Sequence, residues 1–168
     1  MKKLTMALFA CALAAGALAD EAADLKKNVQ SAMDQASKAM MKKDMAGAEK
    51  ILRQYFAKDF KNTDLHGKTT TLEQWLGEMK AQMPMVKSID KMNLKCVSVK
   101  VHGDHAVCQE SMEMVMTMPN PQDPKKTSQA RQVSTSESHM EKRHGKWWVV
   151  SSKDKTSRMW FDGKEMKM

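Results

Sequence analysis

The sequence lacks the short motifs that mark common classes of enzyme and nucleic-acid-binding protein. It contains no G-x-S-x-G nucleophile elbow, no glycine-rich phosphate loop, and no serine, histidine and aspartate in a triad order. Its formal net charge is +8, yet no run of like charge is interleaved with aromatic residues. The basic residues come in pairs among acidic ones, as at Lys42-Lys43, which is typical of a solvated surface. These absences argue against nucleophilic catalysis and against nucleic-acid binding.

Long apolar runs are also scarce, and the clearest one lies at the N-terminus. MKKLTMALFACALAAGALA has two lysines, an apolar segment over Leu4–Leu13, and an A-x-A-like site that ends at Ala19. The apolar segment is too short to span a bilayer, and polar residues follow it. A lipid anchor at Cys11 is disfavoured because Phe9 stands where a small residue is expected. We predict a signal peptide over residues 1–19 and an exported chain, periplasmic or secreted, without membrane insertion.

Residues 20–168 have the length of one ordinary domain and begin with helical periodicity. Apolar residues recur every three or four positions over Glu21–Lys43, which predicts an amphipathic helix. A second helix, MAGAEKILRQYF, follows a capping Asp44. A third, LEQWLGEMKAQM, follows Thr71 and is closed by Pro84.

Beyond the third helix the period becomes two, which is typical of β-strands. Alternating valines lead to a Gly-Asp hairpin turn at 103–104, and the alternation returns in a methionine-rich segment. PNPQDPKK is a loop by composition, Arg131–Lys142 and KWWVVSS are expected strands, and residues 162–163 form a last hairpin turn. A short strand is expected at Phe60–Thr63. Helices therefore precede an antiparallel sheet, and we predict a single α+β domain.

Four segments occur in an order that is more specific than any of them alone. They are Y-F-A-x-D-F at the end of the second helix, D-x-x-G at Asp64, V-x-V-x-G-D-x-A-V over Val99–Val107, and H-G-K-W-x-V-V over His144–Val150. From Ala22 to Ser152 this order resembles the nuclear transport factor 2-like superfamily, especially its SnoaL-like and ketosteroid-isomerase-like bacterial members. The resemblance implies a cone, in which helices pack into the concave face of a strongly bent antiparallel sheet and leave a pocket.

The resemblance implies a chemical role for Asp64, whereas the local sequence favours a simpler one. In the isomerase branch the matching aspartate is a general base, and a tyrosine and a protonated aspartic acid donate to an oxyanion. Here Ala36 stands about where that tyrosine would be, and the second donor falls near Ser138. The alternative, which we favour, is that Asp64 accepts backbone N–H groups in a turn. His139 is a second candidate base, if its strand directs it into the pocket.

Methionine is abundant, with 18 residues, and it occupies periodic positions that usually carry leucine. The M-x-M pattern that starts at Met114 offers thioethers to Cu(I) and also sites for sacrificial oxidation. An inward-facing strand produces the same alternation, so we interpret the methionines as core or pocket lining. We expect no metal and no cofactor. The expected pocket-lining residues are Tyr55, Phe60, Trp75, Met112, Met114 and Trp147.

Cys96 and Cys108 flank the predicted hairpin. If residues 103–104 form its turn, Cys108 opposes Val99 and Cys96 opposes Ser111. The two sulfurs would then point to opposite faces of the sheet. We therefore predict two free thiols.

Binding is the function that these observations favour over catalysis. We predict an exported domain that holds a small, mostly apolar ligand without converting it. One alternative is an isomerase- or cyclase-type enzyme that uses Asp64 or His139 as a base. Another is an envelope interaction module whose pocket is filled by its own methionines. Trp148 and Val150 face away from the expected helices, so we also predict a homodimer through the sheet, a pairing that the resemblance implies.

Overall fold

The computed structural model describes residues 4–120, 123 and 125–166. The helices are α1 (Leu4–Met41), α2 (Met45–Tyr55), α3 (Leu72–Gln82) and the short 3₁₀ helix η1 (Met83–Met85). The strands are β1 (Phe56–Thr63), β2 (Thr69–Thr71), β3 (Ser88–His102), β4 (His105–Pro119), β5 (Thr127–Arg143), β6 (Lys146–Phe161) and β7 (Lys164–Met166). None of these helices is both long and apolar enough, within the described residues, to cross a membrane.

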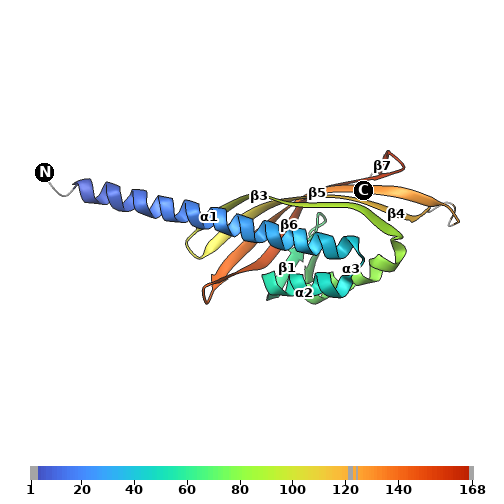
Figure 1. The fold of residues 1–168 in the computed structure, drawn as a ribbon, viewed down its shortest axis with the longest axis horizontal. Helices are drawn as coiled ribbons and strands as arrows, with labels where there is room; N and C mark the ends of the chain where they lie inside the picture. Colours follow the sequence, from blue (N-terminus) through green and yellow to red (C-terminus); the bar gives the residue numbers. More distant parts are fainter. Residues whose placement is uncertain (1–3, 121–122, 124, 167–168) are drawn as a thin grey trace.

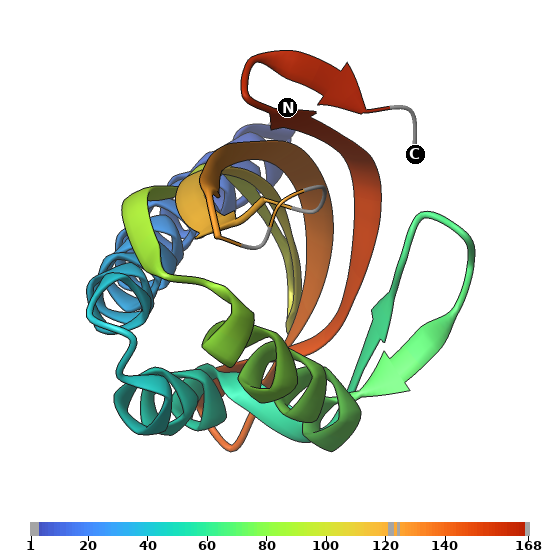
Figure 2. The ribbon, with the colours of Figure 1, turned by 90° about the vertical axis from the view of Figure 1, so that its right-hand side faces the viewer.

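The strands form one bent sheet that wraps around the helices. Its order is β2-β1-β6-β5-β4-β3, and β7 pairs with β6 beside this path. Only the pairing of β1 with β6 is parallel among the described strands. Figure 2 shows the long strands curving around the space that α1, α2 and α3 close, and Figure 1 shows α1 extending past the sheet at its N-terminal end. The predicted α+β cone is confirmed.

The two shorter helices begin where the sequence predicts. Asp44 accepts a hydrogen bond from the Gly47 N–H over 2.8 Å, which satisfies a free donor in the first turn of α2. Thr71 and Gln74 form a reciprocal capping box at α3, with N···O distances of 2.9 and 3.3 Å. These local contacts explain why both helix starts can be located from sequence.

Helix α1 packs along β3, which is an edge strand of the sheet. The Gln30 amide donates to the Leu94 carbonyl and accepts from the Cys96 N–H, each over 2.9 Å. The Ser37 hydroxyl donates to the Met92 carbonyl over 2.9 Å. An uncovered edge strand would present free backbone groups to other chains, so these side chains take the place of a further strand.

The interior contains two groups of buried apolar side chains. The larger joins α1, β1, α3 and the four long strands, and Phe60, at 1% exposure, lies inside it. The smaller lies at the other end of the long strands and is rich in methionine. Its buried members are Val86, Ile89, Met116 and Ala130. The methionines thus replace leucine in part of the core, as the sequence indicates.

Several element boundaries differ from the sequence prediction. Strand β1 begins at Phe56 rather than Phe60, and β2, at Thr69–Thr71, was not predicted. The four long strands extend well beyond their predicted segments, since each hairpin continues its hydrogen-bonded ladder past the alternating part. Helix α1 runs without a break from Leu4, so it includes most of the predicted signal peptide. Cleavage after Ala19 stays a prediction.

Candidate functional site

The concave face of β3, β4, β5 and β6 is apolar at its ends and polar in the middle. Cross-strand partners there form rows, because side chains alternate between the two faces of a sheet. One end row contains Val101, Ala106, Met140 and Val149. The middle rows contain Val99, Cys108, Ser138 and Ser152, then Cys96, Glu110, Ser136 and Asp154. The rows beyond contain Leu94, Met112, Ser134 and Ser157, then Met92, Met114, Gln132 and Met159.

Glu110 lies at the centre of this polar band, which we define as Glu110, Ser136, Ser138, Ser152 and Asp154. The Ser136 hydroxyl donates to the Glu110 carboxylate over 3.0 Å, and the Ser138 and Ser152 hydroxyls are 3.2 Å apart. Burial raises the pKa of Glu110, and the hydrogen bonds from Ser138 and Ser136 offset only part of that increase. The chain thus holds a carboxyl group with a strengthened proton affinity inside the cone.

Asp154 is a second carboxyl group with a raised pKa on the same face. Burial is the main cause of the increase, and the negative charge of Asp64 adds to it. The Asp154 charge in turn contributes to the raised pKa of Glu110. The charge of Asp64 therefore acts on Asp154, and the charge of Asp154 acts on Glu110. Such groups can exchange protons with a bound molecule, and they also favour ligands that donate hydrogen bonds.

Asp64 makes the turn contacts that the local sequence suggests. Its carboxylate accepts from the N–H groups of His66 and Lys68, each over 2.9 Å. Its backbone N–H donates to the Lys68 carbonyl over 3.0 Å, and Gly67 adopts a positive φ of 81° between them. Asp64 thus holds the β1–β2 turn while its charge acts on Asp154.

His139 lies on the convex face, opposite the polar band. It pairs with Val107 and Ser151, and its Nε2 is 3.4 Å from a Glu137 carboxylate oxygen. With a side-chain exposure of 52%, it lines a convex-face depression of about 290 Å³ together with His102 and His105. No group of three possible ligands among the described residues has a geometry that would hold a metal ion.

The predicted pocket-lining residues fall into two groups. Phe60 and Trp75 pack in the larger core with Phe56, at ring-centroid distances of 4.6 to 6.0 Å. Trp147 also packs against this core. Met112 and Met114 are half-buried on the concave face, in the rows beside Glu110, and Tyr55 is half-buried at the end of α2. Of the predicted set, the two methionines are the ones that neighbour the polar band in the sheet.

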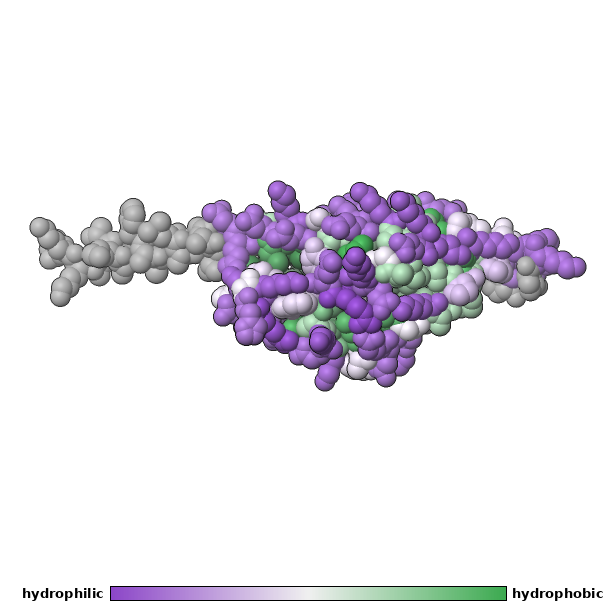
Figure 3. Space-filling model, turned by 60° about the horizontal axis from the view of Figure 1, so that its bottom comes forward, coloured by the Kyte–Doolittle hydropathy of each residue, from purple (hydrophilic) through white to green (hydrophobic). Residues whose placement is uncertain are grey.

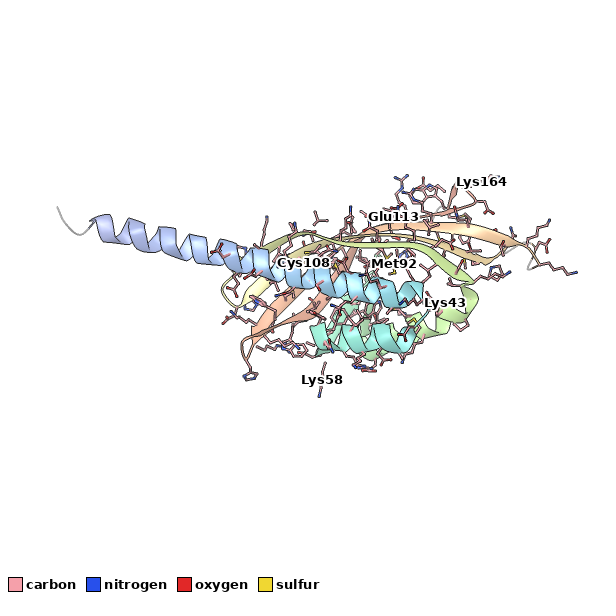
Figure 4. All side chains as sticks on the ribbon, in the orientation of Figure 1. Lys43, Lys58, Met92, Cys108, Glu113 and Lys164 are labelled. Carbon is pink, nitrogen blue, oxygen red and sulfur yellow. The ribbon has the colours of Figure 1, made fainter. Side chains whose placement is uncertain are left out.

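The predicted orientation of the two cysteines is wrong. Val99 does pair with Cys108, but Cys96 pairs with Glu110 rather than Ser111. A β-bulge at Val97 causes this shift, so both thiols lie on the concave face. Figure 4 shows Cys108 and Met92 between α1 and the sheet, and Glu113 on the outer side. The two sulfurs are not bonded to each other in this structure, and the oxidation state of the pair in solution stays a prediction.

The sequence prediction missed Glu110 and Asp154. Glu110 is two residues before Met112, which was predicted to line the pocket, so its position was visible in the pattern. Asp154 carried no such signal. Two bulges in β6, at Val150 and Lys155, reset its register, and alternation alone does not locate bulges.

No protein-family model matches the sequence, and a comparison with curated proteins finds no relative. Solved structures are nevertheless similar. A conserved protein from Planctomyces limnophilus superposes with a TM-score of 0.61 at 11% identity, covering 77% of this chain and 92% of that one. A nuclear transport factor 2-like superfamily protein from Salmonella enterica gives a TM-score of 0.56 at 14% identity, with 79% and 91% covered.

A nuclear transport factor 2-like protein from Cytophaga hutchinsonii gives a TM-score of 0.54 at 12% identity and covers 77% of this chain and 96% of its own. The chain therefore has the nuclear transport factor 2-like fold. At these identities the similarity establishes the fold and leaves the chemistry to the side chains described above.

Proposed function

We propose that this chain is an exported domain that binds a small, mostly apolar molecule against the concave face of its sheet. The observation that carries the proposal is the polar band between apolar rows, with Glu110 at its centre. Met92, Met112, Met114 and Met159 provide a flexible apolar surface on one side of the band. Glu110 offers a hydrogen bond that would orient the ligand's polar group.

The protonation state of Glu110 decides which polar group is preferred. Its raised pKa favours the neutral carboxyl, which donates a hydrogen bond to a carbonyl or hydroxyl oxygen. After ionisation the carboxylate accepts from an alcohol or an ammonium group instead. We therefore expect ketone binding to weaken, and amine binding to strengthen, as the pH rises through the pKa of Glu110.

Calorimetric titration with 2-decanone, decanol and decylamine at several pH values tests this proposal. Glu110→Gln should abolish the pH dependence and weaken decylamine binding about tenfold, the usual loss for a charged hydrogen bond. Glu113→Gln is the matched control, because it makes the same change on the convex face of the same strand. Equal effects of the two substitutions, or no binding of any probe by the wild type, would contradict the proposal.

The raised pKa values of Glu110 and Asp154 also favour a second candidate, an isomerase-type enzyme. In that function neutral Glu110 would donate to a carbonyl oxygen, while ionised Asp154 or Asp64 would remove a proton from the adjacent carbon. Deuterium exchange into a ketone panel in D₂O measures this proton transfer directly. Exchange that depends on Glu110 and on one of the aspartates would replace binding alone as the function.

We also propose a homodimer that pairs through the convex face of the sheet. Trp148 pairs with Glu141 on this face, Val150 lines the depression that contains His139, and Lys146 Nζ is 3.9 Å from the centroid of the Trp148 ring. Figure 3 shows another side, where Figure 1 places α2 and α3; there most of the surface is hydrophilic and apolar residues emerge in patches between charged ones. Light scattering at micromolar concentration should give a dimer mass, and Trp148→Glu should give a monomer. A monomer mass for the wild type would contradict this pairing.

A further inference from the structure

Cys96 and Cys108 are close neighbours in the core, and both are buried from solvent. Their Sγ atoms are 3.0 Å apart, and the residues are 4% and 0% exposed. The sheet register explains this proximity, because Val97 is an extra residue in β3 that has no partner in β4. One extra residue moves every following side chain to the other face, and here it brings Cys96 onto the face of Cys108.

Helix α1 holds the bulge in place from outside the sheet. Lys26 Nζ donates to the Val97 carbonyl over 2.7 Å. Gln30 binds both sides of the bulge, accepting from the Cys96 N–H and donating to the Leu94 carbonyl. The position of Cys96 is therefore set by backbone contacts that do not involve its sulfur.

We propose that Cys96 and Cys108 form an intramolecular disulfide that links β3 to β4 across the Val97 bulge. A disulfide requires the two sulfurs to approach from 3.0 Å to about 2.05 Å, which is a movement of roughly 1 Å. The sulfurs thus need to move by less than the length of one covalent bond. In an exporting cell the oxidant would be the disulfide of another thiol compound or of a thiol-oxidising protein.

The two cysteines have different roles in this reaction. The hydrogen bond between the two sulfurs lowers the pKa of Cys96 and raises that of Cys108, and burial adds to the increase at Cys108. The Cys96 thiolate attacks one sulfur of the oxidant's disulfide and displaces the other sulfur as a thiolate. Cys108 then loses its proton, attacks the Cys96 sulfur and displaces the second thiolate. The cysteines lose two protons and two electrons, and the oxidant becomes two thiols.

Neither step needs a base from the protein, because the two displaced thiolates take up the two protons that the cysteines lose. Because both sulfurs are buried, the oxidant can reach them before the sheet closes or during local opening of the β3 edge. The folded sheet then shields the product from reduction.

Peptide mapping of the full chain tests the proposal. Trypsin cleaves after Lys95, Lys100 and Lys125, so the two cysteines fall in separate peptides, 96–100 and 101–125. Cys11 lies in a third peptide and does not interfere. We expect monomeric protein, equilibrated with reduced and oxidised glutathione and then alkylated, to yield peptides 96–100 and 101–125 joined by a disulfide. Cys108→Ser should remove this product.

The decisive quantity is the equilibrium of the pair with glutathione in the folded chain and in urea. We expect the folded chain to favour the disulfide at least 30-fold more than the unfolded chain, roughly the ratio expected for a short closed loop in good geometry. The measurement starts from reduced and, separately, from oxidised protein. Agreement of the two end points shows that equilibrium was reached even if glutathione reaches the buried cysteines slowly. An equal or smaller preference in the folded chain, or no joined peptides from either direction, would overturn the proposal.

Discussion

Two carboxylates three residues apart on β4 behave in opposite ways. Glu113 faces outward, where Lys91 and Arg131 contact it at 2.6 and 3.0 Å, and these hydrogen bonds lower its pKa. Glu110 faces inward among serines, where burial raises its pKa. The same residue type on the same strand is thus a solvated ion-pair partner on one face and a proton-holding group on the other.

Neighbouring strands repeat this contrast. On the convex side of β5, Glu137 is 3.1 Å from Lys155, and the hydrogen bond between them lowers the pKa of Glu137. On the concave side of β6, the pKa of Asp154 is raised by burial. The difference shows that the convex face neutralises its acids with lysine and arginine, while the concave face encloses them with serines. A site for chemistry or ligand binding is therefore to be sought inside the cone.

The largest contrast should be in stability, between two adjacent residues of β5. Met140 is 2% exposed in the larger core, whereas His139 faces outward. Met140→Ala should reduce the free energy of unfolding by about 2–5 kcal/mol, because it leaves a cavity. His139→Ala should change it by less than about 0.5 kcal/mol. Urea denaturation followed by circular dichroism measures both, and similar losses would mean that the faces are assigned wrongly.

A smaller effect should appear in the pH dependence of stability. In the folded state Glu110 keeps its proton above its ordinary pKa of 4.5, so stability falls as the pH rises from that value to the folded pKa. Glu110→Gln removes this loss, since the amide oxygen still accepts from Ser136. The variant should gain on the order of 1–2 kcal/mol relative to wild type at about pH 8, and little at about pH 4.

Glu113 should show the opposite trend, which provides the control. Its folded pKa is below 4.5, so its contribution is present above that pH and is lost as the pH falls through the folded value. Glu113→Gln should therefore lower the melting temperature at about pH 7 and leave it unchanged at about pH 2. If the stability of Glu110→Gln and of Glu113→Gln changed with pH in the same direction relative to wild type, the proposed difference between the concave and convex faces would be contradicted.

The smallest effect should come from Asp64, which links a surface turn to the concave face. Asp64→Asn should match wild-type stability, because its side-chain oxygen can still accept from His66 and Lys68. Asp64→Ala should cost about 1 kcal/mol through loss of these hydrogen bonds. Both substitutions should lower the pKa of Asp154, since the Asp64 charge raises it. Thermal unfolding measures the stability and carboxyl NMR titration measures the pKa of Asp154. An unchanged pKa of Asp154 in both variants would show that the charge of Asp64 does not act on Asp154.

Local sequence signals were sufficient for the starts of α2 and α3 and for the hairpin turns. Asp44 and Thr71 each satisfy backbone donors within three residues, and the Gly-Asp turn at 103–104 joins β3 to β4 as predicted. Contacts of this short range involve residues close together in the sequence, so the local sequence is enough to predict them. Strand β2 was missed because a three-residue strand has too few positions to show alternation.

The sequence alone determined the α+β class, the capped helices and the inward alternation of the methionine strand, because each depends on residues close together in the chain. Only the tertiary structure decided which groups meet. The bulge at Val97 depends on contacts from Lys26 and Gln30, about 70 residues earlier, and it brings Cys96 to Cys108. The raised pKa of Glu110 likewise arises from burial in the packed chain, which the hydrogen bonds from Ser136 and Ser138 on another strand offset only in part. Burial and register are properties of the packed chain, and no local pattern contains them.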